Sequence, residues 1–411
     1  MTEGLADRVI LHCDCNSFFA SVEALLDPEL KNVPMAVCGS EEDRHGIILA
    51  KNEAAKKYNI KTAETVYLAR KKCPQLVTVR PHHDAYVEYS RRVNRIYSEY
   101  TDLIEPFGID ESWLDITSRT RFFGSPSEIA EEIKRRVFEE IGITLSIGVS
   151  FNKVFAKLGS DLKKPNAITY INRDNYKSLV YPLPVSDLLF VGKQTCDALA
   201  GIGVTRIGEL ASLSRERLIC EFGKLGGTLY SYANGLDASP VVPSSSSDRK
   251  SISNGMTFKR NVTMADEWRM CVSFLCEELG TKLRASDSLC RSVGITIKDE
   301  HLNSYQRQTT LDTPTDLADE ISSAAFKLLK GEWNEGTPIR TLTVCAQSLM
   351  SKNSDFRQLD LLDSSAEAHR AKTAKKEKTL DIIRQKFGKS SIMLASGVGS
   401  DVGILPDDDE E

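Results

Sequence analysis

Residues 101–117 read Thr-Asp-Leu-Ile-Glu-Pro-Phe-Gly-Ile-Asp-Glu-Ser-Trp-Leu-Asp-Ile-Thr, and they place two adjacent carboxylates, Asp110 and Glu111, between two apolar runs. Strand interiors disfavour aspartate, and adjacent like charges repel each other unless a cation lies between them. The pair therefore predicts a metal site at a strand end. For an Asp-Glu pair taken alone, the alternative is an acidic hairpin tip in solvent.

A second acidic position, far upstream, favours the metal site. Residues 8–14 form an apolar run, typical of a buried strand, that ends at Asp14 and is soon followed by two aromatic residues. Two strands lying side by side would bring Asp14, Asp110 and Glu111 together. Three carboxylates at one point can hold two hard cations such as Mg²⁺.

Length and composition indicate an ordinary globular protein. The chain has 411 residues, of which 41% are hydrophobic and 27% charged, and this length is enough for two to four domains. No run approaches the ~20 apolar residues of a membrane span, and no signal peptide begins the chain, so we expect a cytoplasmic protein. The ten cysteines form no CxxC pair and have no histidine at zinc-finger spacing, which favours a reduced compartment without zinc.

The net charge of −5 argues weakly against binding to nucleic acid, because such proteins usually carry a basic surface. Six of the negative charges lie at position 401 and at 407–411, so residues 1–400 alone carry a net charge of +1. A metal-binding core must also be locally acidic. Net charge therefore excludes little.

Helical periodicity marks several segments. Tyrosines and aliphatic residues recur at helical spacing over residues 81–103, which indicates a core stripe. We expect Ser127 to cap a helix over 128–141, and a lysine-rich helix from Lys153 to Lys164 that ends before Pro165. Long helices are also expected over 265–285 and, with a basic character, over 372–387. Residues 400–411 are acidic and predicted to be disordered.

Three blocks of sequence carry a resemblance to a known family. Residues 14–23, 108–115 and 146–157 resemble the signature blocks of the Y-family DNA polymerases, in the family's order and at its spacing. The similarity is closest to the bacterial DinB, or DNA polymerase IV, type, and residues 14–18 also resemble the catalytic subunit of polymerase V. The resemblance covers about residues 8–395.

This resemblance implies an α+β fold: a multidomain right-hand polymerase with a βαββαβ palm. The implied parts are a palm (1–32 and 81–180), small fingers (33–80), a helical thumb with a helix-hairpin-helix (181–240), a linker (241–250), an α/β little finger (251–350) and a C-terminal tail (351–411).

The resemblance also assigns roles at the active site. Asp14, Asp110 and Glu111 would be catalytic and hold two Mg²⁺, together with the backbone carbonyl of Cys15. The second aromatic after the strand, Phe19, resembles a steric gate that leaves no room for the 2′-hydroxyl of a ribonucleotide. Phe18 and Phe19 are the aromatic nucleotide-site candidates, and the alternative for both is core packing; we expect one ring in the core and one at the sugar.

Two lysines are expected to bind the triphosphate. By resemblance Lys164 contacts the β- and γ-phosphates, and Lys56 can act as a point charge. The fingers depart from the DinB pattern, because Ala50, Glu53 and Lys56 stand where Thr, Tyr and Arg are common. The alternative for such lysines is a solvated helix face.

Several positions are DNA-backbone candidates. In the thumb, Gly192, Lys193 and Gly203 resemble a hairpin whose backbone N–H groups grip a phosphate, with Phe190 where a glycine is usual. The alternative is that these glycines only mark the ends of helices and bind no phosphate. In the little finger the candidates are cations on strands, which also deter edge aggregation: Lys259, Arg260 and Arg291.

A short peptide after the little finger resembles the bacterial sliding-clamp-binding motif. It runs from 358 to 362, and its anchor residues are Gln358, Leu359, Leu361 and Leu362. Together the motifs predict a monomeric translesion DNA polymerase that acts on primer–template DNA and dNTPs and docks on the β clamp. The alternatives are a non-catalytic polymerase-like protein that links DNA to the clamp and another palm-type enzyme such as a nucleotidyl cyclase.

Overall fold

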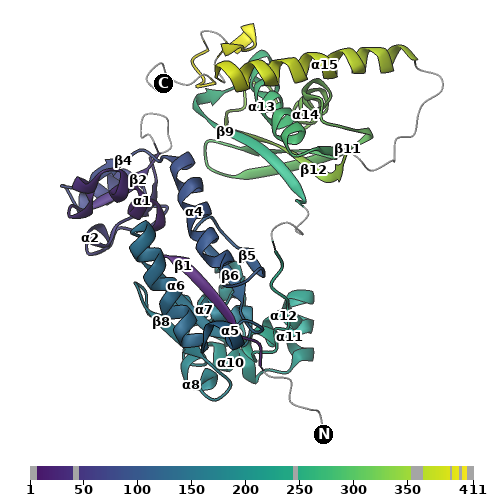
Figure 1. Ribbon diagram of the computed structural model, residues 1–411. Coiled ribbons are helices and arrows are strands. Elements are labelled where there is room, and N and C mark those ends of the chain that lie inside the picture. Colours follow the sequence, from purple (N-terminus) through teal and green to yellow (C-terminus); the bar gives the residue numbers. More distant parts are fainter. Residues whose placement is uncertain are drawn as a thin grey trace. The chain divides into compact units, whose positions relative to one another are not determined.

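The computed structural model describes residues 7–39, 46–243, 249–352, 364–388, 391–397 and 400–404. The chain forms two compact units, residues 1–39 with 47–247 and residues 248–411 with 40–46 (Figure 1). Among the described helices, none combines the length and the apolar character that crossing a bilayer requires.

The first unit contains most of the secondary structure. Its elements, in chain order, are β1 (Ile10–Cys15), α1 (Phe18–Leu26), β2 (Met35–Cys38), β3 (Ile48–Lys51), α2 (Glu53–Lys56), α3 (Val66–Lys72), β4 (Val77–Val79), α4 (His83–Ser98), β5 (Ile104–Pro106), β6 (Glu111–Asp115), α5 (Thr120–Phe123), α6 (Pro126–Ile141), β7 (Leu145–Ser150), α7 (Lys153–Leu162), β8 (Ile168–Ile171), α8 (Tyr176–Val180), α9 (Lys193–Gly201), α10 (Ile207–Ser212), α11 (Arg215–Phe222) and α12 (Lys224–Ala233).

The main sheet has the order β5-β6-β1-β7-β8, so β1 is its central strand. Strand β1 is antiparallel to both β6 and β7. Side chains alternate between the two faces of a strand. Leu11 and Cys13 join the buried core that α4 and α6 form with the sheet, whereas His12 faces Ser160 of α7. The alternation therefore directs polar residues of β1 toward α7.

Helix boundaries differ slightly from the predicted ones. Helix α6 begins at Pro126, and its N-cap is Ser125, not the predicted Ser127; the Ser125 hydroxyl accepts the backbone N–H of Glu128 while the Glu128 carboxylate accepts the backbone N–H of Ser125. Helix α7 ends at Leu162, two residues before the predicted end. Lys164 therefore lies just past the helix. The predicted core stripe in α4 is confirmed, since Tyr86, Val93, Ile96 and Tyr97 are buried.

Two smaller groups flank the main sheet. A three-stranded sheet of order β3-β2-β4 carries α2 and α3. Helices α8–α12 form the other group around a core that includes Leu199, Leu210, Leu218 and Leu229. Phe155 of α7 belongs to this same core, so α7 lies between the main sheet and the helical group.

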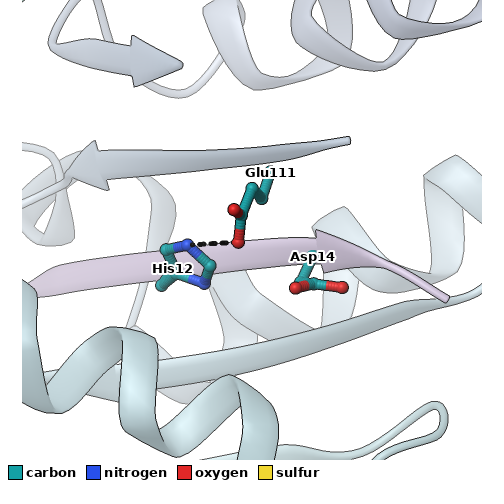
Figure 2. A group of neighbouring side chains, drawn as sticks. All are labelled: His12, Asp14 and Glu111. Carbon is teal, nitrogen blue, oxygen red and sulfur yellow. Dashed lines mark ion pairs between the residues drawn. The ribbon is translucent and has the colours of Figure 1, made fainter. Parts of the chain in front are cut away.

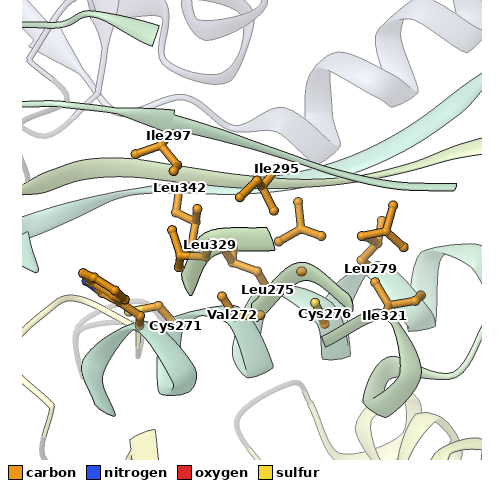
Figure 3. Close-up of a cluster of buried hydrophobic side chains, with 14 of the residues drawn as sticks. Cys271, Val272, Leu275, Cys276, Leu279, Ile295, Ile297, Ile321, Leu329 and Leu342 are labelled. Atoms are coloured by element: carbon orange, nitrogen blue, oxygen red, sulfur yellow. The ribbon is translucent and has the colours of Figure 1, made fainter. Parts of the chain in front are cut away.

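The second unit is a four-stranded sheet packed against helices. Its elements are β9 (Ser251–Val262), α13 (Ala265–Ala285), β10 (Ser288–Lys298), β11 (Ser304–Thr315), α14 (Ala318–Glu332), β12 (Ile339–Ser351) and α15 (Ser364–Phe387), and the sheet order is β11-β10-β12-β9. Figure 3 shows α13 packing Val272, Leu275 and Leu279 against Ile295 and Ile297 of the sheet. The predicted helix over 265–285 is confirmed by α13.

The C-terminal segment is more ordered than predicted. Val402 and Ile404 are buried in the core of the second unit, and the Val402 carbonyl accepts the backbone N–H of Lys259. The prediction of disorder is therefore wrong for 400–404, because two apolar side chains there find a core to fill. Residues 405–411, the clamp-like peptide 358–362 and residues 244–248 of the predicted linker lie outside the described residues.

Candidate active site

The pairing of β1 with β6 brings Asp14 and Glu111 together and places the backbone of Asp110 beside β1. Asp14 lies directly opposite Glu111, and the backbone N–H of Cys15 donates to the Asp110 carbonyl at 2.9 Å. Gly108 leaves room for both side chains, since a Cβ there would lie 3.3 Å from Asp110 Oδ1 and from Glu111 Cγ. Asp14 and Glu111 face the same side of the sheet, next to His12 (Figure 2).

Two lysines neutralise these carboxylates. Lys157 Nζ lies 2.5 Å from Glu111 Oε2 and 3.5 Å from Asp14 Oδ2. Lys164 Nζ lies 2.7 Å from Asp14 Oδ2 and 2.8 Å from Asp161 Oδ1. Burial opposes the charge of both lysines, but the carboxylate contacts outweigh it and raise the pKa of each. The predicted phosphate ligand Lys164 thus lies at the acidic cluster, and its contact with the triphosphate stays a prediction.

His12 is a residue of the site that the sequence reasoning missed. It is fully buried, its Nε2 lies 3.3 Å from Glu111 Oε2, and its Nδ1 lies 2.8 Å from Ser160 Oγ. The Ser160 hydroxyl also lies 2.7 Å from the Lys157 carbonyl oxygen, so Ser160 connects His12 to α7. One atom each from His12, Asp14 and Glu111 lie within 4.8 Å of one another.

The surroundings of Asp110 and Glu111 shift the pKa values of these two adjacent acids in opposite directions. Burial raises the pKa of Asp110 to about 6, and repulsion from Asp14 and Glu111 acts in the same direction. Burial also opposes ionisation of Glu111, but its contacts with His12 and Lys157 outweigh this effect and lower the pKa of Glu111 to about 2. Neighbouring carboxylates whose environments differ in this way are typical of functional sites.

A tight turn links β1 to α1, and the two aromatic residues Phe18 and Phe19 follow it at the start of the helix. Ser17 adopts the left-handed conformation, with φ 49° and ψ 44°. Phe18 is buried in the core, as predicted for one of the two rings. Phe19 is half-buried and stacks on Tyr86, with ring centroids 4.1 Å apart and an interplanar angle of 11°. The Tyr86 hydroxyl donates to the buried carboxylate of Glu23, which holds the tyrosine ring in place.

The predicted phosphate ligand Lys56 and its neighbours Glu53 and Ala50 lie in α2 and β3. Lys56 pairs with Glu53 at 2.5 Å, and Glu53 also accepts from the Ser17 hydroxyl at 3.1 Å. Glu53 therefore links α2 to the start of α1. In β3, Ala50 packs against the same small buried cluster as Phe19 does.

At the position of the predicted thumb hairpin, Phe190 has the backbone conformation of the glycine that is usual there. Phe190 adopts a left-handed φ of 65° and is 62% exposed, and Gly203 has φ 80°. Gly192 is the N-cap of α9, and both Gly192 and Lys193 are exposed. A phenylalanine thus takes the conformation that favours glycine.

Two of the predicted little-finger cations differ in their surroundings. Arg260 is bound by Asp401 at 2.7 Å and Glu267 at 2.5 Å, so its charge is already paired. Arg291 is exposed on β10.

Comparison with known proteins identifies the family. The impB/mucB/samB family model matches residues 13–161, and the model of that family's C-terminal domain matches residues 249–361. A DNA polymerase IV of Acetivibrio thermocellus is 44% identical over 386 residues, which cover 94% of this chain and 96% of the relative. A DNA polymerase IV of Moorella thermoacetica is 38% identical and covers 97% and 98% of the two chains. The chain belongs to the Y family of DNA polymerases, DinB type.

A solved structure supports the fold of this Y-family polymerase. The Y-family DNA polymerase chimera Dbh-Dpo4(243-245)-Dbh matches with a TM-score of 0.74 and 21% identity, over 84% of this chain and 99% of that chain. The family membership confirms a DNA-directed DNA polymerase of the translesion type, acting on primer–template DNA and dNTPs. It also disfavours the accessory-protein alternative, because relatives named as polymerases cover almost the whole chain.

The residues of the site fit the metal dependence of the family. Carboxylate oxygens are the ligands that hard divalent cations prefer, and Asp14 and Glu111 offer one oxygen each within 4.8 Å. Asp110 precedes Glu111 in the chain and is a third carboxylate beside this pair, although the group whose atoms lie within 4.8 Å of one another consists of His12, Asp14 and Glu111.

Proposed function

We propose that the polymerase uses two Mg²⁺ ions held by Asp14, Asp110 and Glu111, with the backbone carbonyl of Cys15 as a further ligand. The observation that carries this proposal is the register of β1 and β6, which places Asp14 opposite Glu111 and ties Cys15 to Asp110. When bound, such ions would supply Lewis-acid activation of the primer 3′-hydroxyl and neutralise charge on the α-phosphate and the leaving pyrophosphate.

The side chains around the carboxylates then bind and orient the nucleotide. Lys164 lies beside Asp14 at the end of α7, where its ammonium neutralises the β- and γ-phosphates, and Lys56 adds a further point charge. The ring of Phe19, backed by Tyr86, lies under the incoming sugar and excludes a 2′-hydroxyl. Tyr86 stacks on the face of the Phe19 ring that is turned away from the sugar, so the ring cannot easily move aside for the 2′-hydroxyl of a ribonucleotide.

We also propose which parts of the chain hold the DNA. The main sheet is the palm, the β3-β2-β4 sheet the fingers, helices α8–α12 the thumb and the second unit the little finger. In the thumb, backbone N–H groups near Gly192, Lys193 and Gly203 bind a phosphate without reading bases. In the little finger, Arg291 and Lys259 follow the template backbone. Arg260 would first have to leave Asp401.

The test of the metal site is primer extension with Mg²⁺ by the Asp110→Ala variant. Loss of one metal-binding carboxylate should lower the rate about 10³-fold or more with DNA binding largely kept. The matched control is Asp102→Ala, because Asp102 lies in the same segment but is 86% exposed and pairs with Arg119 at the surface. Extension at the wild-type rate by Asp110→Ala would exclude the assigned site.

We propose further that the polymerase is a cytoplasmic monomer that docks on the bacterial sliding clamp through residues 358–362. All ten cysteines are free thiols, which suits a reduced compartment. The combined variant Gln358→Ala, Leu361→Ala should lose clamp pull-down, whereas the nearby Ser354→Ala should keep it. Retained binding by the first variant would refute the docking peptide.

A further inference from the structure

The ammonium of Lys157 occupies the place among the carboxylates where a cation is needed. Its Nζ lies 2.5 Å from Glu111 Oε2, 3.3 Å from Asp161 Oδ2 and 3.5 Å from Asp14 Oδ2. Its side chain is only 18% exposed, so solvent screens these contacts weakly. Two of the three oxygens belong to carboxylates assigned above to the metal ions.

The backbone of Lys157 is held firmly, so only its side chain is free to move. Its carbonyl accepts the Ser160 hydroxyl at 2.7 Å, and Ser160 is also hydrogen-bonded to Nδ1 of His12 in β1. Helix α7 also lies close to the sheet, because Gly148 of β7 faces the backbone of Ala156. The helix therefore presents Lys157 to the strand ends from a fixed position.

A divalent cation and the Lys157 ammonium compete for the same oxygen of Glu111. Like charges cannot share a ligand atom at these distances without strong repulsion. Asp161 lies one turn further along the same helix and is a second acceptor, which Lys157 already contacts at 3.3 Å. Lys157 can therefore leave Glu111 and keep an acidic partner.

We propose that Lys157 is a resident counter-ion of the metal site, which holds Glu111 and Asp14 together in the metal-free polymerase and keeps only Asp161 as its acidic partner when a divalent cation binds. This inference rests on the metal site proposed above. It implies that the wild-type protein binds metal more weakly than its carboxylates alone would, because each binding event must first displace the lysine. Lys157 is thus a positioning residue.

The test is Mn²⁺ binding to the full chain without DNA, measured by electron paramagnetic resonance of free and bound Mn²⁺. The Lys157→Gln variant should bind Mn²⁺ at least tenfold more tightly than the wild type, and Lys157→Arg should bind no more tightly than the wild type. The matched control is Lys163→Gln, which removes the same charge from an exposed residue just past α7. It should bind as the wild type does.

Equal or weaker Mn²⁺ binding by Lys157→Gln would overturn the inference, because a lysine that only orients Glu111 would aid the metal. Asp161→Asn should weaken Mn²⁺ binding more in the wild type than in the Lys157→Gln background. An identical effect in both backgrounds would also overturn it, and Lys157→Met, which likewise removes the charge, takes the place of the glutamine variant if that variant does not fold. Wild-type Mn²⁺ binding by Asp14→Asn would instead refute the metal site itself.

Discussion

Gly148 decides how closely α7 approaches the central strands, and its replacement by alanine gives the sharpest structural test. A Cβ at position 148 would lie 1.9 Å from the Ala156 carbonyl oxygen and 2.5 Å from the Ser160 backbone nitrogen. Both atoms belong to the helix backbone and cannot rotate away. Because ordinary van der Waals contact begins at 3.4 Å, α7 must retreat by about 1.5 Å.

The expected cost follows from this displacement. Overpacking a core costs about 1–3 kcal/mol when side chains can yield, so a clash with backbone should cost about 3 kcal/mol or more. The same retreat lengthens the contacts of Lys157 and Lys164 with Glu111 and Asp14, now 2.5 and 2.7 Å, toward about 4 Å, the limit of an ion pair. Misplacement by about 1 Å can lower a rate about 100-fold, and we expect a loss of this size.

The assay combines urea unfolding with single-nucleotide incorporation. Two other glycines give a graded series: Gly159→Ala places a Cβ 3.1 Å from the Gly148 Cα, and Gly331→Ala meets nothing within 4 Å. We expect a small loss of stability for the first, and no loss or a gain of about 0.5–1 kcal/mol for the second. A Gly148→Ala protein within about 0.5 kcal/mol of the wild type and with a normal incorporation rate would refute the reasoning.

Three further outcomes are expected. Phe19→Ala should relax discrimination against ribonucleotides, because the ring stacked on Tyr86 is lost; unchanged dNTP-to-rNTP selectivity in incorporation assays would remove Phe19 as the gate. The affinity of the site for divalent cations should rise as the pH rises through about 6, because Asp110, whose pKa is raised to about 6, must lose its proton to bind an ion. Mn²⁺ titrations from pH 5 to 7 should show this rise, and the Asp110→Asn variant should not show it. Glu377→Ala should destabilise the second unit by roughly 1–3 kcal/mol in urea unfolding, because Arg284 of α13 and the backbone N–H of Ala318 each lose a buried partner while Arg284 keeps Asp381. An unchanged stability would show that the second unit does not depend on this pair.

The sequence by itself determined the family, the carboxylates and much of the secondary structure. The three signature blocks stand in continuous segments, and strand β1, the core stripe of α4 and helix α13 follow local periodicity that needs no knowledge of neighbours. Local sequence patterns predicted the ends of helices less accurately than their interiors. Either Ser125 or Ser127 is a suitable cap, and the reciprocal bonds of Ser125 with Glu128 decide between them.

Only the tertiary structure decided which side chains surround the carboxylates. Lys157 looked like one of several lysines on a solvated helix, and His12 like part of an apolar strand. They meet Glu111 because β1 pairs with β6 and because α7 packs closely over Gly148. The same holds for α15 and for Val402, which find partners in the second unit more than ninety residues away in sequence. Such contacts depend on strand register and helix packing, which periodicity in one segment does not specify.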